Sequence, residues 1–456
     1  MDRKPIPVIA IFDIGKTNKK FFLFNAQYQI VLEESVQFDE VVDEDGFPCD
    51  DLQQMTAWIK NTFAEILERE EFVIHAVNVT SYGASFVHID LHGDPVTVLY
   101  NYLKPFPPDL QNEFYEKYGG VSRLSAITAS PVLGSLNSGL QLYRIKKEQP
   151  ALFQKIAWSL HLPQYISFLL TGNAFSELTS IGCHTLLWDF NTNHYHSWVY
   201  QEKLAEKFPP VVPSDKTFEI ICGGRTLVAG VGLHDSSSAL IPYLACFTEP
   251  FILLSTGTWC ISLNPFNEEI LTEAELTNDC LCYLQYNGRQ VKASRLFAGN
   301  EHEIQTKKIA THFDVPADYW KKQLFSQEIY NRISEEKMQA VSLSGLHHSA
   351  FVQRDLFEFT DYETAYHQLI ADFVQQQEFA LKLVIPAKKP SRIFVDGGFA
   401  KNDLFMKMLA LAFPEMDIYA ASVSQATALG AALAIHTSWN HNRIPEQLIA
   451  LKKYTS

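Results

Sequence analysis

The sequence predicts an α/β protein with two domains, each built on a mixed sheet flanked by helices. A chain of 456 residues is longer than one hydrophobic core usually grows. Short strand-like runs, such as residues 8–12, 75–79 and 392–395, alternate with helical patterns along the chain. This alternation is typical of mixed α/β folds rather than of helical bundles or β-sandwiches. Apolar types form 47% of the residues and charged types 20%, so we expect compact, folded domains.

Local patterns locate the main elements. Residues 8–12 and 21–24 are apolar runs on either side of a short segment that contains a glycine, which predicts a β-hairpin. In residues 52–68 and 361–385, apolar side chains recur at helical spacing. We therefore expect a helix with one buried face in each range.

The domain boundary is expected where a helical pattern ends. Residues 241–250 close at a proline, directly before the strand-like run 251–255. We place the boundary there, which gives domains of residues 1–243 and 244–456.

Net charge excludes several classes of partner. The chain has 37 basic and 52 acidic residues, a net charge of −15, and lacks the basic face that nucleic acids and anionic membranes need. No window approaches the ~20 apolar residues of a membrane-spanning helix, and the first residues do not resemble a secretory signal. We therefore expect a cytoplasmic protein that binds neither nucleic acid nor membrane.

Seven cysteines are scattered through the chain. An odd number, mostly within apolar segments, favours buried and reduced thiols. Cys280 and Cys282 form a C-x-C pair, but no second pair stands nearby in the sequence to complete a tetrahedral zinc site. We expect no structural metal.

Gly15-Lys16-Thr17 matches the last three letters of the Walker phosphate loop. The full motif also needs a glycine five residues before Gly15, where Ala10 stands, and a helix after the threonine. A strand-like run follows instead. The P-loop interpretation therefore fails on both requirements.

A hairpin turn rich in Gly, Thr and Asn can still bind phosphate, because successive backbone N–H groups attract an anion. Asp13 at the strand end could hold Mg²⁺, directly or through water. The alternative is an ordinary hairpin in which Asp13 and Gly15 serve only the turn geometry. Residues 251–263 repeat the pattern around Thr256-Gly257-Thr258. Two such turns, one in each domain, predict that one nucleotide is bound from both sides of a cleft.

Two further motifs join strands to helices. Asp396-Gly397-Gly398 is a turn after a strand, and Asn402 then caps a helix. The paired glycines leave room for a flat group, although a plain strand–turn–helix connection explains them as well. A second strand ends at His234-Asp235, before another helix. Asp235 has two interpretations, as a helix N-cap or as a base whose charged form the helix dipole favours.

These motifs, in this order, resemble those of the FGGY carbohydrate kinases of the actin-like ATPase superfamily. The resemblance spans nearly the whole chain, and residues 162–189 and 232–239 are similar to the rhamnulose kinase-like branch. It implies two actin-like ATPase (ribonuclease H-like) domains with a cleft between them. The first would hold a phosphate hairpin, the sugar site and the catalytic aspartate, and the second would hold the other phosphate hairpin and the adenosine motif.

The resemblance also implies the roles of individual residues. Asp235 would be the catalytic base, and Asp13 would hold Mg²⁺. The sugar contacts would be Tyr82, Gly83, His234 and Asp235. The contacts to ATP would be Asp13, Gly15, Lys16, Thr17, Asn18, Lys20, Thr256, Gly257, Thr258, Gly397, Gly398 and Asn402.

The implied reaction is transfer of the γ-phosphate of ATP to a ketose hydroxyl, with L-rhamnulose and L-fuculose as candidates. A pentulose such as xylulose, or another polyol, stays open, because the chain departs from the family's usual pattern. Lys16 replaces a small residue, Gln425 replaces a common Glu, and the region around Ser294-Arg295 lacks an expected Asn. A catalytically silent nucleotide-binding sensor on the same scaffold also stays open, as does a homodimer.

Overall fold

The computed structural model describes residues 4–257, 259–335, 349–386 and 389–455, and these form two compact units. Unit 1 holds the chain up to Cys246 together with Cys282–Gln290 and Ser424–Leu448; unit 2 holds Phe247–Leu281, Val291–Val423 and the chain from Ile449 on. Two segments from late in the sequence thus belong to unit 1.

The sheet of unit 1 is mixed, as expected. The strands β1 (Ile6–Ile14) and β2 (Lys19–Asn25) form an antiparallel hairpin, and β6 (Phe72–Ser81) pairs with β1 in parallel. The strand order is β13 (Thr217–Cys222), β14 (Arg225–Gly230), β6 (Phe72–Ser81), β1 (Ile6–Ile14), β2 (Lys19–Asn25) and β3 (Ile30–Val36), with the short β15 (Leu233–His234) also paired to β6.

Helix α1 (Leu52–Glu68) confirms the first helix prediction. It begins after Asp51, whose side chain accepts a hydrogen bond from the Gln54 amide. Its apolar face packs with alternate residues of β1, among them Phe12 and Ile14, in one core. The even residues of the strand therefore face α1, since side chains alternate along a strand.

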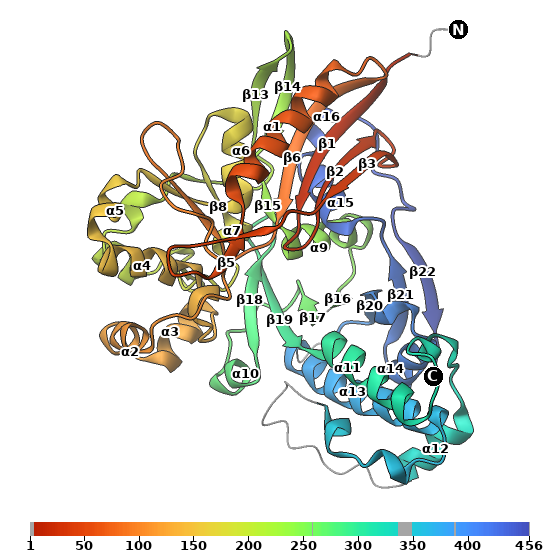
Figure 1. The fold of residues 1–456 in the computed structure, drawn as a ribbon. Helices are drawn as coiled ribbons and strands as arrows, with labels where there is room; N and C mark the ends of the chain where they lie inside the picture. The colour runs from red at the N-terminus through yellow and green to blue at the C-terminus, as the bar shows by residue number, and fades with distance from the viewer. Residues whose placement is uncertain (1–3, 258, 336–348, 387–388, 456) are drawn as a thin grey trace. The chain divides into compact units, whose positions relative to one another are not determined.

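Helices α9 (Asp235–Cys246) and α15 (Ala426–Ala434) pack on each other, and α15 also packs on β1 and β6. Figure 1 shows α15, from the C-terminal end of the colour scale, beside the N-terminal strands β1 and β2. The helices approach closely because position 430 is glycine. A Cβ at Gly430 would lie 1.8 Å from the Ser238 carbonyl oxygen.

The rest of unit 1 consists of short helices and two-stranded sheets. The pairs are β4 (Glu40–Val42) with β5 (Pro48–Asp50), β7 (Phe86–Ile89) with β8 (Trp158–His161), β9 (Ser176–Glu177) with β12 (Val211–Val212) and β10 (Trp188–Asp189) with β11 (His194–Tyr195). The helices are α2 (Pro108–Lys117), α3 (Val121–Thr128), α4 (Ser138–Glu148), α5 (Pro150–Lys155), α6 (Leu162–Thr171), α7 (Leu178–Ile181), α8 (Ser197–Gln201) and α16 (His436–Trp439).

The second large sheet repeats the arrangement of the first. The strands β16 and β17 form an antiparallel hairpin, and β20 pairs with β16 in parallel. The strand order is β18 (Cys280–Leu284), β19 (Gln290–Leu296), β17 (Cys260–Asn264), β16 (Phe251–Thr256), β20 (Arg392–Gly397), β21 (Asp417–Ser422) and β22 (Ala450–Tyr454). The predicted echo between the two hairpins is therefore confirmed at the level of strand pairing.

Helix α13 (Tyr362–Val384) confirms the second helix prediction, and α11, α12 and α14 pack on it. Buried residues of α13, α14 and β16 share one core. The other helices are α10 (Glu273–Thr277), α11 (Ala298–His312), α12 (Gln327–Glu335) and α14 (Asp403–Ala412). None of the helices in the described part of the chain is long and apolar enough to cross a membrane.

Candidate active site

The turn between β1 and β2 holds the first predicted phosphate motif. The Gly15 amide donates to the Asn18 carbonyl over 3.0 Å, which closes the turn. Thr17 and Asn18 are exposed, while Asp13 is only partly exposed at the end of β1. The turn therefore presents its backbone and short polar side chains to solvent, as phosphate binding requires.

Asp13 lies beside the first turn of α15. Its Oδ2 accepts a hydrogen bond of 2.6 Å from the Thr427 hydroxyl. Burial raises the pKa of Asp13 to about 6, and the charge of Asp235 adds to the rise, against the Thr427 hydrogen bond and the charge of Lys20. The charge of Lys20 does not offset the burial of the Asp13 carboxyl group, so an added cation would stabilise the charged form of Asp13.

The side chain of Lys16 bonds to carboxylates of the same unit. Its Nζ donates to Asp50 Oδ2 over 2.6 Å and lies 3.3 Å from Glu40 Oε1. Lys19, which is 1% exposed, donates to the other Asp50 oxygen over 2.7 Å. The predicted phosphate contact of Lys16 therefore competes with a tight ion pair.

Lys20, the other basic residue predicted for this motif, lies on β2, and its side chain reaches Gln425, the residue before α15. Its Nζ donates to Gln425 Oε1 over 3.3 Å and lies 3.5 Å from Glu33 Oε1. A Glu at position 425 would place a second carboxylate beside Glu33. The amide instead accepts from Lys20 and donates to Glu33.

Asp235 begins α9 and keeps 31% of its side chain exposed. Its Oδ1 accepts hydrogen bonds from the Ser236 amide (2.5 Å) and the Ser236 hydroxyl (3.2 Å). His234 Nε2 lies 3.2 Å from the same oxygen. Burial lowers the pKa of His234, although the charge of Asp235 opposes this shift. The neutral imidazole can therefore donate one hydrogen bond to the carboxylate.

Of the predicted sugar residues, His234 contacts the Asp235 carboxylate, Gly83 packs on the His234 ring, and Tyr82 bonds to Asp50. A Cβ at Gly83 would lie 2.8 Å from the His234 ring, so only glycine lets the turn pack on the imidazole. Cys183 Sγ lies 3.2 Å from His234 Nε2. The Tyr82 hydroxyl donates to Asp50 over 2.8 Å, and its ring is nearly buried.

Sequence reasoning missed Tyr102, whose ring centroid lies 6.0 Å from that of Tyr82. Burial raises the pKa of the Tyr102 hydroxyl, the charge of Lys16 lowers it, and the charges of Asp235 and Asp50 raise it. Tyr102 therefore shares the surroundings of the candidate base. Asp50 was also missed, and the contact of Thr427 with Asp13 was not predicted, because no local sequence pattern marks contacts that bridge 34 and 414 positions.

In unit 2, the second turn packs against the glycine turn of the predicted adenosine motif. The Gly398 amide donates to the Thr256 carbonyl over 2.8 Å, and the Phe399 amide donates to the Thr256 hydroxyl over 3.0 Å. Gly397 has φ +89°, and a Cβ there would lie 1.9 Å from the Thr256 carbonyl oxygen. The Gly257 amide closes its own turn on the Trp259 carbonyl. Thr258 lies outside the described residues.

A cavity of about 430 Å³ adjoins this glycine turn and is lined in part by Gly397, Lys401, Ala421 and Leu451. Asn402 has a structural role, as its N-cap interpretation predicts. Its side chain accepts from the Phe405 amide over 3.2 Å and donates to the Tyr366 hydroxyl over 2.8 Å.

No group of three or more His, Cys, Asp or Glu side chains in the described ranges could hold a metal ion. Asp13 offers a single carboxylate. Mg²⁺ is commonly bound by one or two carboxylates together with substrate phosphates and water. The donor set around Asp13 therefore fits an ion that arrives with a nucleotide.

Both halves of the chain match models of one protein family. Residues 8–235 match the N-terminal domain of the FGGY family of carbohydrate kinases, and residues 248–443 match a carbohydrate kinase FGGY C-terminal domain. A rhamnulokinase from Klebsiella pneumoniae (strain 342) is 27% identical over 284 residues, which cover 59% of this chain and 56% of that protein. A rhamnulokinase from Halalkalibacterium halodurans is 25% identical over 262 residues, 55% of this chain and 54% of that protein. The matched region thus spans little more than half the length of these relatives.

Solved structures share the fold over nearly the whole chain. A carbohydrate kinase from Novosphingobium aromaticivorans has a TM-score of 0.80 at 22% identity, covering 99% of this chain and 94% of that one. Ligand-bound xylulose kinase from Lactobacillus acidophilus has a TM-score of 0.79 at 15% identity, with the same coverage. The predicted fold class is therefore confirmed.

Proposed function

Because the chain belongs to the FGGY family of carbohydrate kinases, we propose that it transfers the γ-phosphate of ATP to a hydroxyl group of a ketose. The observation that carries this proposal is the position of Asp235. Its partly exposed carboxylate lies at the N-terminus of α9, beside the predicted sugar residues and close enough to Asp13 for their charges to interact. A base beside a potential metal-bound phosphate is what phosphoryl transfer to an alcohol needs.

Asp235 would orient the acceptor hydroxyl and take its proton. In a loose phosphoryl-transfer transition state the attacking oxygen needs positioning more than a strong base. The bonds from Ser236 to Oδ1 hold the carboxylate in place at the N-terminus of α9. Asp13 would hold Mg²⁺, which would neutralise charge on the β- and γ-phosphates.

The nucleotide would be bound by backbone groups of the glycine turns. The turn around Gly15 and the turn of Thr256 and Gly257 would contact the phosphates, and the glycine turn with its adjoining cavity would receive the adenosine. The amides of Gly15 and Gly257 each close their own turn on a backbone carbonyl, so both segments are tight glycine turns, in which neighbouring N–H groups can bind an anion.

The acceptor would lie against Tyr82, Gly83 and His234. Rhamnulokinases are among the relatives, which favours L-rhamnulose or the related L-fuculose. A pentulose or another polyol is the alternative, since a xylulose kinase shares the fold.

The test is ADP release from MgATP with a panel of ketoses and polyols. We expect one acceptor to accelerate ADP release. Asp235→Asn should lower kcat by at least ~10²-fold, the scale of lost general-base catalysis, while ATP affinity measured by calorimetry stays nearly unchanged. Silence across the panel together with tight ATP binding would favour a nucleotide-binding sensor. Unchanged turnover in Asp235→Asn would remove this residue from the mechanism.

A further inference from the structure

The hairpin of β4 and β5, residues 40–50, contacts three segments of the candidate sugar and phosphate sites. None of its residues belongs to a predicted motif. Two of its carboxylates, Asp43 and Asp50, are almost buried. Each accepts hydrogen bonds from side chains of other segments, so the hairpin joins parts of unit 1 that are distant in sequence.

Asp50 links the phosphate hairpin to the sugar turn. It accepts from Lys16 and Lys19 of the first and from the Tyr82 hydroxyl of the second. Burial raises the pKa of Asp50, but the hydrogen bonds from the two lysines outweigh it and hold the pKa below its ordinary value. The carboxylate is therefore charged at neutral pH, when all three hydrogen bonds form.

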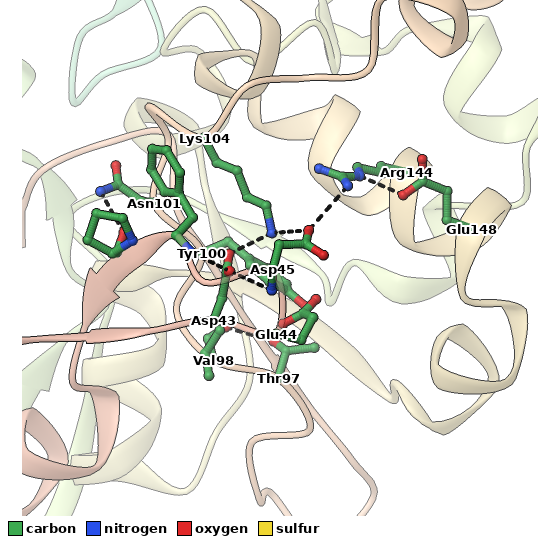
Figure 2. A network of polar contacts seen from close by, with 12 residues as sticks. Asp43, Glu44, Asp45, Thr97, Val98, Tyr100, Asn101, Lys104, Arg144 and Glu148 are labelled. Atoms are coloured by element: carbon green, nitrogen blue, oxygen red, sulfur yellow. Dashed lines mark hydrogen bonds and ion pairs between the residues drawn. The ribbon is translucent and has the colours of Figure 1, made fainter.

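Asp43 holds the loop that carries Tyr102. Figure 2 shows the Lys104 ammonium between Asp43 and Asp45, at 2.6 and 2.7 Å. Asp43 Oδ1 also accepts from the amides of Asp45 and Phe47, which fixes the hairpin turn itself. Three more contacts join the same loop and hairpin: Asn101 to the Pro48 carbonyl (3.0 Å), Tyr100 to Glu44 (2.6 Å) and the bridge between Leu99 and Asp50.

We propose that the β4–β5 hairpin is a brace for acceptor binding, in which Asp50 and Asp43 are positioning residues. Asp50 fixes the turn at Tyr82 relative to the phosphate hairpin, and Asp43, through Lys104, fixes the loop at Tyr102. Lys16 is part of this brace through its ion pair with Asp50. The effect on acceptor binding rests on the proposed function, whereas the contacts of the brace are a property of the free protein.

The chain offers a matched control in the same unit. Glu202, equally buried, accepts from two lysines, Lys117 and Lys146, and from the Tyr118 hydroxyl. This is the same set of donors that Asp50 has, but it lies among α2, α4 and α8, away from the candidate site. Glu202→Gln therefore removes a comparable buried charge without touching the brace.

Hydrogen exchange of the free protein tests the brace directly. The amides of Gly15, Tyr82 and Lys104 are reporters, since each donates to a backbone carbonyl within the braced segments. In Asp50→Asn, exchange in peptides covering Gly15 and Tyr82 should accelerate at least ~10-fold. In Asp43→Asn, the peptide covering Lys104 should respond instead. Glu202→Gln should leave all three within about twofold of the parent.

Equal protection of these peptides in Asp50→Asn and in the parent would overturn the brace, whether or not the protein is a kinase. If Asp50→Asn does not fold, Tyr82→Phe removes one hydroxyl donor, and Tyr118→Phe is its control. With an acceptor found by the panel, Asp50→Asn should raise the acceptor KM at least ~10-fold, while Glu202→Gln stays within about twofold. A panel without any acceptor would defeat the proposed function, and the exchange result would still decide the brace.

Discussion

Replacing Gly430 with alanine should displace α15 from α9 and disturb the candidate active site. The added Cβ would lie 1.8 Å from the Ser238 carbonyl oxygen, whereas ordinary contacts begin at 3.4 Å. One helix must therefore move by about 1.6 Å, the difference between these distances. Helix α15 carries Thr427, which donates to Asp13, and α9 begins with Asp235. A shift of this size either breaks that hydrogen bond or misplaces the base.

The expected losses follow from this displacement. Misplacing a reacting group by 1 Å costs roughly 10²-fold in rate, so kcat should fall by at least that factor. Overpacking costs about 1–3 kcal/mol, which the ~1 kcal/mol advantage of alanine within a helix only partly offsets. For a protein of 456 residues, each kcal/mol lost lowers Tm by about 1 °C, because the entropy of unfolding grows with chain length.

The assay compares kcat, from acceptor-dependent ADP release, with Tm from circular dichroism. Gly172→Ala is the control. Gly172 has φ +70° and nothing within 4 Å of an added Cβ, so this variant loses about 1–2 kcal/mol through backbone strain alone. We expect Gly172→Ala to lower Tm while kcat stays within about twofold. If Gly430→Ala keeps the parental kcat, the contact between α9 and α15 does not position Asp235.

Three further outcomes are expected. Gly397→Ala should lower Tm of the free protein, because the added Cβ would lie 1.9 Å from the Thr256 carbonyl oxygen. Gly398→Ala is the control and should be tolerated, since its Cβ would lie 3.9 Å from the same atom. Equal Tm values for the two variants would contradict the packing of Gly397 on Thr256. Asp13→Ala should raise the Mg²⁺ concentration for half-maximal turnover about 10-fold, and the parental titration curve would remove Asp13 from the metal site. Burial lowers the pKa of His88 and of His161 from 6.5 to about 3. The unfolded chain therefore binds protons below pH 6.5 that the folded protein does not. Stability should fall with falling pH between 6.5 and 3, at up to about 1.4 kcal/mol per pH unit for each histidine. Urea midpoints that stay constant from pH 7 to pH 5 would contradict this.

Local sequence patterns were sufficient to predict the elements that carry the site. Both hairpins, α1 and α13 follow from apolar spacing over a few residues, and the N-cap role of Asn402 follows from its place before a helix. The P-loop was rejected on two local requirements, and the β1–β2 hairpin agrees with that rejection.

Contacts between distant segments could not be predicted in this way. The carboxylate partner of Lys16 lies 34 positions away, in a three-residue strand without a recognisable motif. The residue that bonds to Asp13 lies 414 positions away. Such pairs depend on which surfaces the whole fold brings together, and local sequence patterns do not show which distant segments will meet. Tyr102 was missed for the same reason, because its contact with Tyr82 follows from the fold and not from a local sequence pattern.

Because Ser424–Leu448 belongs to unit 1, unit 1 cannot finish folding until this late segment has been synthesised. When Cys246 leaves the ribosome, the faces of β1, β6 and α9 that α15 will cover are still bare. About 200 more residues must be translated before that helix exists, which takes roughly 10–40 s at about 5–20 residues per second. The nascent chain therefore exposes apolar surface for that time. The N-terminal half cannot complete its native packing before almost the entire polypeptide has been made.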